Sequence, residues 1–521
     1  MRLKPINNMY NNKPPPDPAV DISAYTEYYR KSYWNVSGRS KDYVGLGTGN
    51  PNWQPYLPAI ARAEENLRRP HILNSYGSTG GTFHSTYYLP LLKRMGIELP
   101  VSEDKASQCM TPGNGVTQLY TAAVNSLLGE DDILLMPVPT YGYFLKTENL
   151  SHTHVKPLAL PYENGFRLTP EILDECIEKT NKEMSPKRVT AFLNINPHNP
   201  TGIIYEADEI RAFAKVLQKH GIKLVIDDMV YAGLEFRRAT YDPASGNEKE
   251  KKELAQSLPV PFAAIDGMFD KTITLFGLSK AYNLPGLRAG LAVGPKNLIA
   301  PVRKYIGDNV EFISPIAQAA MTEVFGEDED NTRTLYLHQQ ALHFFKRCYG
   351  LRAMLNGIDD PLVRCLPGIT PLEVANMLCE DQMFVQEALK ETDKNSFDLL
   401  HTRNMIYKQV RNGGIKGVDL ACDPWAGFFV ILDLTSLKGK YYGSQKIESG
   451  IDLVKALISC SNVDSLPGES MGYYGDRILL RISTSADVDK MVKGMMGIND
   501  LVERVQDHPF DLPKTRGRTM G

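Results

Sequence analysis

Short apolar runs alternate with longer amphipathic segments between about residue 43 and residue 293 of the chain. Runs rich in β-branched and aliphatic residues, about four to eight residues long, are typical of buried strands. Such runs predict strands over Asp132–Pro137, Val155–Leu160, Val189–Ile195, Lys223–Asp227, Thr272–Phe276 and Ala289–Val293. Segments with the apolar period of a helix predict helices over Val116–Leu128, Thr169–Thr180 and Glu206–His220. This alternation favours an α/β fold in which helices cover both faces of a sheet.

The pattern changes after about Pro315. Residues 317–415 are mostly helical and rich in charge, and they precede two strand-like runs and a final amphipathic segment: Gly427–Leu434, Arg477–Ile482 and Ala486–Val505. We therefore expect a large α/β domain over 43–316 and a smaller α+β domain over 317–521 with a helical insertion. Residues 1–42 start with an Asn- and Pro-rich stretch and predict an extended arm. The charged stretch 237–259 predicts an exposed insertion loop.

Composition narrows the class of protein further. The 521 residues carry 58 basic and 61 acidic side chains, a net charge of −3 that offers no footprint for nucleic acid or an anionic membrane. No apolar run approaches the ~20 residues that a membrane span needs, and the first residues lack the apolar core of a signal peptide. The seven cysteines are scattered, which favours reduced thiols and a cytoplasmic location.

The most informative motif surrounds Lys280, in Gly277-Leu278-Ser279-Lys280-Ala281-Tyr282-Asn283-Leu284-Pro285-Gly286-Leu287-Arg288. A lysine amine among small residues can form a Schiff base with an aldehyde cofactor. The hydroxyl of Ser279 and the guanidinium of Arg288 can hold a phosphate on that cofactor. A solvated loop lysine is the plain alternative when this motif is read by itself.

Two further motifs follow predicted strands. Asn199-Pro200-Thr201-Gly202 comes after Val189–Ile195 and, by itself, is an ordinary turn. Val225-Ile226-Asp227-Asp228-Met229-Val230-Tyr231 places a carboxylate at the end of a strand, where α/β sheets contact their ligands. Strand alternation sends Asp227 and Asp228 to opposite faces, and we take Asp227 as structural.

These motifs, in this order, resemble those of class I/II aminotransferases, the aspartate aminotransferase superfamily of fold-type I pyridoxal-phosphate (PLP) enzymes. The resemblance implies a three-layer αβα large domain around a mixed, mostly parallel sheet, and a smaller α+β domain that uses both chain ends. It implies that Lys280 carries the cofactor. Asn199 would bond its ring hydroxyl, and the family pattern D-x-x-Y selects Asp228 and Tyr231 for the pyridine nitrogen and the ring oxygen.

A phosphate-binding turn is expected at Asn114-Gly115-Val116-Thr117, just before a predicted helix. Glycine permits close approach there, and free N–H groups at a helix start attract an anion. Gly115, Val116 and Thr117 match the family's phosphate turn. Tyr76 resembles the tyrosine that reaches the phosphate of the neighbouring subunit, although the residues after it depart from the usual pattern, and a surface or core tyrosine is the alternative.

Three residues match family positions around the cofactor ring and the substrate. Tyr141 matches the aromatic residue that stacks on the pyridine ring; otherwise it is a buried loop tyrosine. Arg481 lies in an apolar strand, where a guanidinium requires an anion. The resemblance makes that anion the substrate's α-carboxylate, and an internal salt bridge is the alternative. Gly49 matches a glycine-proline segment on the substrate side, where Asn199 is also placed.

Two departures from the family stand out. Gly277 lies three residues before Lys280, where many relatives have a serine that contacts the phosphate. The helical region 317–415 is longer than in typical members, and it leaves the side-chain pocket of the substrate undefined.

The resemblance implies transamination between an α-amino acid and a 2-oxo acid by a homodimer with shared active sites, with Lys280 as general acid and base. The catalytic residues that the resemblance implies are Lys280, Asp228 and Tyr231. One alternative is a PLP-dependent lyase or decarboxylase of the same fold, acting by β-elimination or amino-cyclopropane formation. A more remote one is a regulator without catalysis, which the short, non-basic N-terminal arm disfavours.

Overall fold

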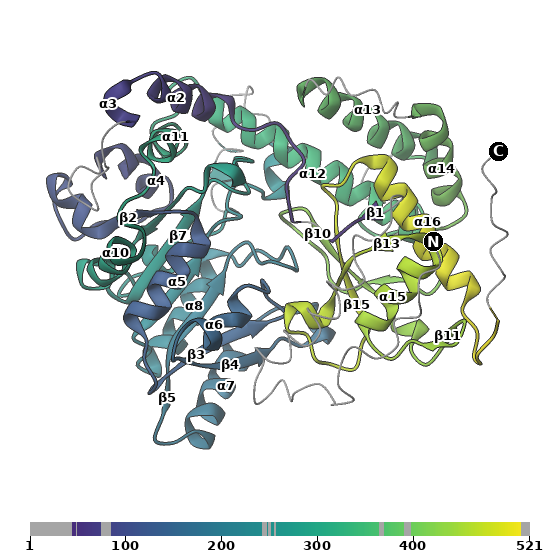
Figure 1. The fold of residues 1–521 in the computed structure, drawn as a ribbon, viewed down its shortest axis with the longest axis horizontal. Coiled ribbons are helices and arrows are strands. Elements are labelled where there is room, and N and C mark those ends of the chain that lie inside the picture. Colours follow the sequence, from purple (N-terminus) through teal and green to yellow (C-terminus); the bar gives the residue numbers. More distant parts are fainter. Residues whose placement is uncertain are drawn as a thin grey trace.

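The computed structural model describes residues 44–47, 49–73, 85–241, 257–363, 369–389 and 398–511, with a few more between 247 and 254. Within these residues a seven-stranded sheet and a four-stranded sheet form the centres of the two halves of the molecule (Figure 1). The expected arm, residues 1–42, and the predicted phosphate contact Tyr76 lie outside the described residues, as does the middle of the expected insertion loop, including residues 242–246.

The large sheet has the strand order β2-β8-β7-β6-β5-β3-β4. Its strands are β2 (Met110–Gly113), β3 (Asp132–Val138), β4 (His154–Ala159), β5 (Arg188–Ile195), β6 (Leu224–Asp228), β7 (Thr272–Gly277) and β8 (Gly290–Val293). The strands from β4 to β7 run parallel, and β8 runs antiparallel to both β7 and β2. The expectation of a mixed, mostly parallel sheet is confirmed, and β2 is a strand that the sequence pattern did not predict.

Alternate residues of β3 enter two separate hydrophobic cores. Leu134 and Met136 belong to the core beneath α5 (Val116–Leu127) and α10 (Lys296–Val310), whereas Ile133 and Leu135 belong to the core beneath α7 (Pro170–Glu183) and α8 (Ala207–Lys219). Because successive side chains of a strand point to opposite faces, the sheet is covered on both sides. This is the expected three-layer αβα arrangement.

Local signals explain where the outer helices begin. The Thr169 hydroxyl accepts a hydrogen bond from the Ile172 N–H at 3.3 Å, and Pro170 occupies the first turn of α7. Helix α8 starts with a reciprocal capping box between Glu206 and Glu209. Both starts lie within one residue of the predicted ones.

The smaller sheet has the order β14-β15-β10-β9, and all its pairs are antiparallel. Its strands are β9 (Asp419–Leu420), β10 (Phe429–Asp433), β14 (Leu466–Pro467) and β15 (Leu479–Ser483). Helices α15 (Gly450–Ser461) and α16 (Val488–Arg504) pack together beside it. Near the start of the described chain β1 (Val44–Gly45) pairs in parallel with β13 (Val463–Asp464), so an early and a late segment of the described chain meet in this half of the molecule.

Helix α12 (Thr332–Asn356) runs between the two halves (Figure 1). Its 25 residues span about 38 Å at 1.5 Å per residue. Near its start, α11 (Pro315–Phe325) packs on α2 (Leu57–Leu67), and along it lie α13 (Pro371–Leu389) and α14 (Leu399–Arg411). The shorter elements are α3 (Pro70–Leu73), α4 (Leu89–Arg94), α6 (Thr147–Leu150) and the hairpin β11 (Tyr441–Tyr442) to β12 (Gln445–Lys446).

Among the described residues, every helix is too short or too polar to cross a membrane. The proposed division at residues 42 and 316 stays a prediction.

The two-sided core of the large sheet leads to a stability prediction. Leu134→Ala removes a fully buried side chain and should lower the free energy of unfolding by about 2–5 kcal/mol. The matched change Leu335→Ala, at a leucine that is 42% exposed, should cost about 0.5 kcal/mol or less. Thermal unfolding of both variants measures the difference, and equal midpoints would contradict the assignment of Leu134 to the core.

Candidate active site

The parallel strands of the large sheet bring several polar side chains to one edge. Because the carboxyl ends of β3, β5, β6 and β7 meet there, residues just beyond each strand become neighbours. A cavity of about 210 Å³ opens at this edge. Most of the residues predicted to bind the cofactor line it: Val116, Thr117, Tyr141, Asn199, Asp228, Tyr231, Ser279, Lys280 and Arg288.

Lys280 lies in the turn after β7, with its side chain largely buried. Its Nζ donates a hydrogen bond to the Gly49 carbonyl oxygen at 2.6 Å. Burial, together with the nearby cations Arg481 and Arg288, lowers the pKa of Lys280 from its usual 10.5 to about 8, although Asp228 opposes the shift. A larger fraction of this amine is therefore neutral, and nucleophilic, near neutral pH than for an ordinary lysine.

Asp228 and Asp227 occupy opposite sides of the end of β6. Asp228 lines the cavity and accepts a hydrogen bond from the Val230 N–H at 3.0 Å; burial raises its pKa to about 7. Asp227 instead accepts hydrogen bonds from Asn194 Nδ2 at 2.8 Å and from the Phe262 N–H at 2.7 Å. Burial raises its pKa to about 6. Asp228 is thus the carboxyl group that faces the cavity, and Asp227 ties β6 to its surroundings.

Asn199 links two other candidate residues. Its Nδ2 donates to the Tyr231 hydroxyl at 3.1 Å, and its Oδ1 accepts from Arg481 at 3.4 Å. Burial raises the pKa of Tyr231, which keeps the phenol protonated. One amide thereby sets the positions of a phenol and a guanidinium on the same side of the cavity.

Arg481 is 6% exposed on β15 of the smaller sheet. It donates to the Gly47 carbonyl at 2.8 Å, and its guanidinium carbon lies 3.9 Å from the centre of the Phe429 ring. A Cβ at Gly49 would lie 3.4 Å from the same ring and 3.9 Å from the Arg481 guanidinium, so the N-terminal segment packs directly against both side chains. Phe429 had no signature in the sequence, because it carries no reactive group and its place depends on pairing opposite Ser483.

The predicted phosphate turn precedes α5. Gly115 has φ +83°, a conformation that favours glycine, and its added Cβ would lie 2.9 Å from the Arg288 guanidinium. Arg288 donates to the Pro285 carbonyl at 2.9 Å. Thr117 at the start of α5 and this guanidinium both line the cavity, and a helix start beside a fixed cation is the arrangement that an anion site requires.

Val116 explains the absence of a serine at Gly277. A Cβ at Gly277 would lie 2.9 Å from Val116 Cγ2 and 3.0 Å from Val230 Cγ2. The valine side chains thus occupy the space that a serine side chain would take. The wall of the cavity is apolar at this point, because the side chains of Val116 and Val230 fill the space and the strand β7 contributes only a glycine.

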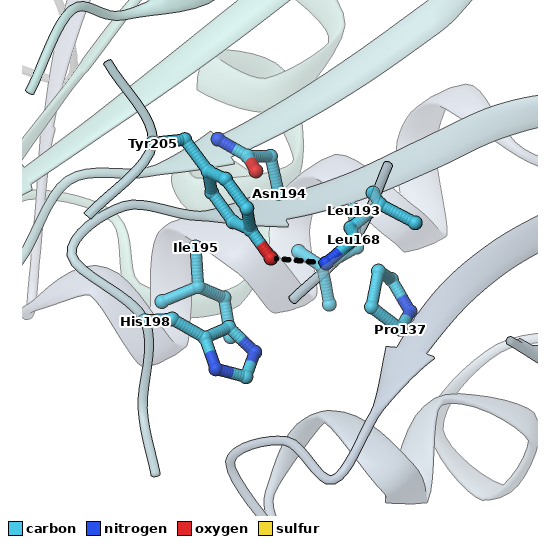
Figure 2. Close-up of a pocket in the computed structure, with 7 residues that line it drawn as sticks. All are labelled: Pro137, Leu168, Leu193, Asn194, Ile195, His198 and Tyr205. Atoms are coloured by element: carbon cyan, nitrogen blue, oxygen red, sulfur yellow. Dashed lines mark hydrogen bonds between the residues drawn. The ribbon is translucent and has the colours of Figure 1, made fainter. Parts of the chain in front are cut away.

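A much smaller cavity lies behind this edge, between β5 and the turn that follows it (Figure 2). Its volume is about 10 Å³, room for about one water molecule, so it is not a ligand site. Tyr205 accepts a hydrogen bond from the Leu168 N–H at 3.1 Å on one side, and His198 faces it from the other (Figure 2). Burial lowers the pKa of His198 to about 4, so this ring is neutral.

The larger cavity fits PLP by the chemistry of its groups. It joins the buried amine of Lys280, the carboxyl group of Asp228, the amide–phenol pair of Asn199 and Tyr231, and a cation beside a glycine turn that could hold a phosphate. Asn50, Phe144, Ile195, Val230 and Pro285 complete its lining. The four apolar residues were not predicted because apolar lining residues leave no motif, and Asn50 was missed because its place depends on the tertiary contact with Ser485.

Comparison with solved structures supports the fold. The aspartate aminotransferase from Rhizobium meliloti superposes with a TM-score of 0.64 at 19% identity, and the match covers 93% of this chain and 96% of that one. The Thermus thermophilus aspartate aminotransferase with maleate gives a TM-score of 0.60 at 16% identity, covering 93% and 97%. At such identities the likeness establishes the fold, and the expected aspartate aminotransferase architecture is confirmed.

Sequence relatives carry similar names. An aspartate aminotransferase from Bacillus subtilis is 25% identical over 468 residues, 89% of this chain and 92% of that protein. A bifunctional aspartate aminotransferase and glutamate/aspartate-prephenate aminotransferase from Petunia hybrida is 24% identical over 285 residues. That match spans 54% of this chain and about half, 52%, of the Petunia protein.

The family assignment follows from the match over most of the chain. Residues 41–373 match the model of aminotransferase class I and II, and these residues include every candidate cofactor contact. Arg481 lies beyond the matched part but meets Asn199 in the structure. The protein therefore belongs to the class I and II aminotransferases, a family of pyridoxal-phosphate-dependent enzymes.

Proposed function

We propose that this protein transfers the amino group of an α-amino acid to a 2-oxo acid and that Lys280 carries the cofactor and moves the proton. The observation that supports this most directly is the burial of the Lys280 amine in one cavity with Asp228, Asn199, Tyr231 and Arg288. Relatives named aspartate aminotransferase make aspartate the first amino acid to test.

Each wall of the cavity would hold one part of the cofactor. Gly115, Val116, Thr117, Ser279 and Arg288 would hold the phosphate, and Tyr141 would stack on the ring. When bound, PLP supplies an electron sink for the carbanion formed at the substrate Cα. The neighbouring carboxylate of Asp228 would keep the ring nitrogen protonated, and Asn199 with Tyr231 would bond the ring oxygen.

The remaining residues would bind the substrate and move its proton. Arg481 would grip the α-carboxylate beside Asn199 and Gly49, because a buried guanidinium provides a fixed pair of donors. Lys280, with its lowered pKa, would take the Cα proton as general base and return it as general acid. The hydrogen bond from its amine to the Gly49 carbonyl supports this role, because Gly49 is the residue proposed to line the substrate side.

Three broader properties are proposed with this function. The protein would act as a homodimer, with Tyr76 reaching the phosphate of the partner's site. Residues 43–316 would form the cofactor-binding domain, and both chain ends would contribute to the smaller one. The cytoplasmic location stays a prediction that rests on the scattered cysteines, and the six of them that the structure describes are free thiols.

The role of Lys280 has a direct chemical test. Lys280→Ala should abolish turnover with any amino acid while leaving the thermal midpoint of the protein within a few degrees. Borohydride treatment of the wild-type protein should fix the cofactor on the peptide that contains Lys280, as mass spectrometry would show. Lys304→Ala, at an exposed lysine of α10, is the control and should keep full activity. A trapped adduct on another lysine would refute the assignment.

The lowered pKa of Lys280 predicts the pH dependence of cofactor attachment. Only the neutral amine attacks an aldehyde, so the attachment rate of the cofactor-free protein should rise with pH with a midpoint near pH 8 rather than near 10.5. Arg481→Leu should move this midpoint upward, because one cation that lowers the pKa is lost. Arg477→Leu, at a residue paired with Asp433, is the control and should not move it.

The same shift affects stability with a definite sign. Between about pH 8 and 10.5 the unfolded chain binds more protons at Lys280 than the folded protein does. The contribution of Lys280 to the free energy of unfolding of the cofactor-free protein should therefore become more favourable as the pH rises across this window. A midpoint of attachment near 10.5 in the wild-type protein would contradict both expectations.

Arg481 should act mainly on substrate binding. Arg481→Lys should lower kcat/KM for the amino acid roughly a hundredfold, since a buried charge pair with the substrate is worth about 2–5 kcal/mol. Arg477→Lys, just before the same strand, should change it less than twofold. Oxo-acid formation, measured beside ammonia and carbon dioxide release, reports transamination; release of either gas without amino-group transfer would favour the lyase or decarboxylase alternative.

A further inference from the structure

Two helices of the C-terminal half are joined by a buried polar network. His343 and Arg347 lie on α12, whereas Asp381 and Gln382 lie on α13, and all four are buried. Arg347 Nε donates to Asp381 Oδ2 at 2.8 Å, and another guanidinium nitrogen donates to Gln382 Oε1 at 2.8 Å. His343 Nδ1 donates to the second Asp381 oxygen at 2.9 Å. Burial lowers the pKa of His343 to about 4, so the neutral ring acts as a donor.

The network continues into the segment that follows the Arg481 strand. Arg347 donates a further hydrogen bond to the Ala486 carbonyl oxygen. Gln382 Oε1 accepts a second one from the Val488 N–H at 2.9 Å, at the start of α16. The residues after β15 are therefore held to α12 and α13 through side-chain contacts on both sides of Asp487.

From this segment, hydrogen bonds lead to the N-terminal wall of the cavity. The Ser485 hydroxyl donates to the Asn50 carbonyl oxygen at 2.6 Å, and Asn50 lines the cavity. Asn52 Nδ2 donates to Asp487 Oδ1 at 2.9 Å. The segment that begins at Gly49 is thus attached to the same residues that Arg347 and Gln382 hold.

Ring contacts also connect the N-terminal segment directly to α12 and α13. The Trp53 ring lies 4.7 Å, centre to centre, from the His343 ring and 5.6 Å from the Phe384 ring of α13. Trp53 is 2% exposed, so its position depends on these helices. The segment 49–53 is therefore fixed at one end by hydrogen bonds and at the other by packing.

We propose that Arg347 is a positioning residue for substrate binding, which sets the place of Asn50 and of the end of the Arg481 strand through Asp381, Gln382 and Ser485. This inference rests on the proposed function, because it assigns the substrate carboxylate to Arg481. Among the described residues, Arg347, Asp381, Gln382 and Ser485 have no hydrogen bond to Lys280 or to the phosphate turn, and the segment reaches Lys280 through the Gly49 carbonyl. We therefore expect the network to act on the substrate side and to leave cofactor binding unchanged.

The physical reason is the low tolerance of a buried guanidinium for displacement. Arg347 is fully buried, and its contacts with Asp381, Gln382 and Ala486 use all three of its nitrogens. A lysine keeps the charge near Asp381 but has no planar fork, so it cannot keep the other two contacts in place. The segment after β15 would then relax relative to α12, and with it Asn50.

The test compares two arginine-to-lysine changes on the same helix. Arg347→Lys should raise KM for the amino acid about tenfold, with kcat changed less than twofold, in keeping with couplings of about 0.5–2 kcal/mol. Arg333→Lys, at a buried arginine that contacts carbonyls at the end of α11, should leave KM unchanged. Both changes disturb a buried arginine, so equal KM values in the two variants would overturn the inference.

A milder pair keeps the test decisive if Arg347→Lys does not fold. Ser485→Ala removes the contact to Asn50 and should raise KM several-fold. Thr484→Val is the control, because the adjacent buried hydroxyl of Thr484 has no hydrogen-bond partner among the described residues. Equal KM values for Ser485→Ala and the wild-type protein would also overturn the inference.

The experiment separates this inference from the proposed function. Cofactor affinity, measured by absorbance titration of the cofactor-free protein with pyridoxal phosphate, should be the same in wild type, Arg347→Lys and Ser485→Ala. A wild-type protein that binds the cofactor but transfers no amino group would refute the proposed function. A lower cofactor affinity in Arg347→Lys alone would show a general structural role instead of substrate-side positioning.

Discussion

Withdrawal of the Lys280 amine from water is the constraint on which the rest of the site depends. A buried ammonium is costly, and the cost is increased by two arginines and reduced by one carboxyl group. This arrangement is possible because parallel strands bring their carboxyl ends to one edge, where segments distant in sequence become neighbours. The strand order brings the side chains of the site close together, and burial of the Lys280 amine lowers its pKa and makes it more nucleophilic.

The second constraint is closure of the site from the other half of the molecule. Arg481 comes from the smaller sheet, whereas Gly47, Gly49 and Asn50 come from the beginning of the described chain. The pairing of β1 with β13 brings these two parts together. The site is thus assembled from early, middle and late segments of the described chain, which couples its geometry to the packing of both halves.

Much of this could be predicted from local sequence, for physical reasons. The strands of the large sheet are buried on both faces, so they appear as continuous apolar runs, and residues with reactive groups mark their ends. Strand β2 was missed because Pro112 and Gly113 interrupt it. Phe429 and the Arg347 network were missed because stacking and helix pairing depend on tertiary contacts, which leave no spacing pattern in one sequence.

Gly277 and Val116 illustrate how neighbouring positions become dependent on one another. A side chain at 277 would collide with a methyl group of Val116, although the two residues are 161 positions apart in the sequence. A serine at position 277 therefore requires Val116, and with it Val230, to move or to be replaced by a smaller residue. This is epistasis with a steric origin, and it restricts the order in which descendants of this sequence could exchange one phosphate pocket for another.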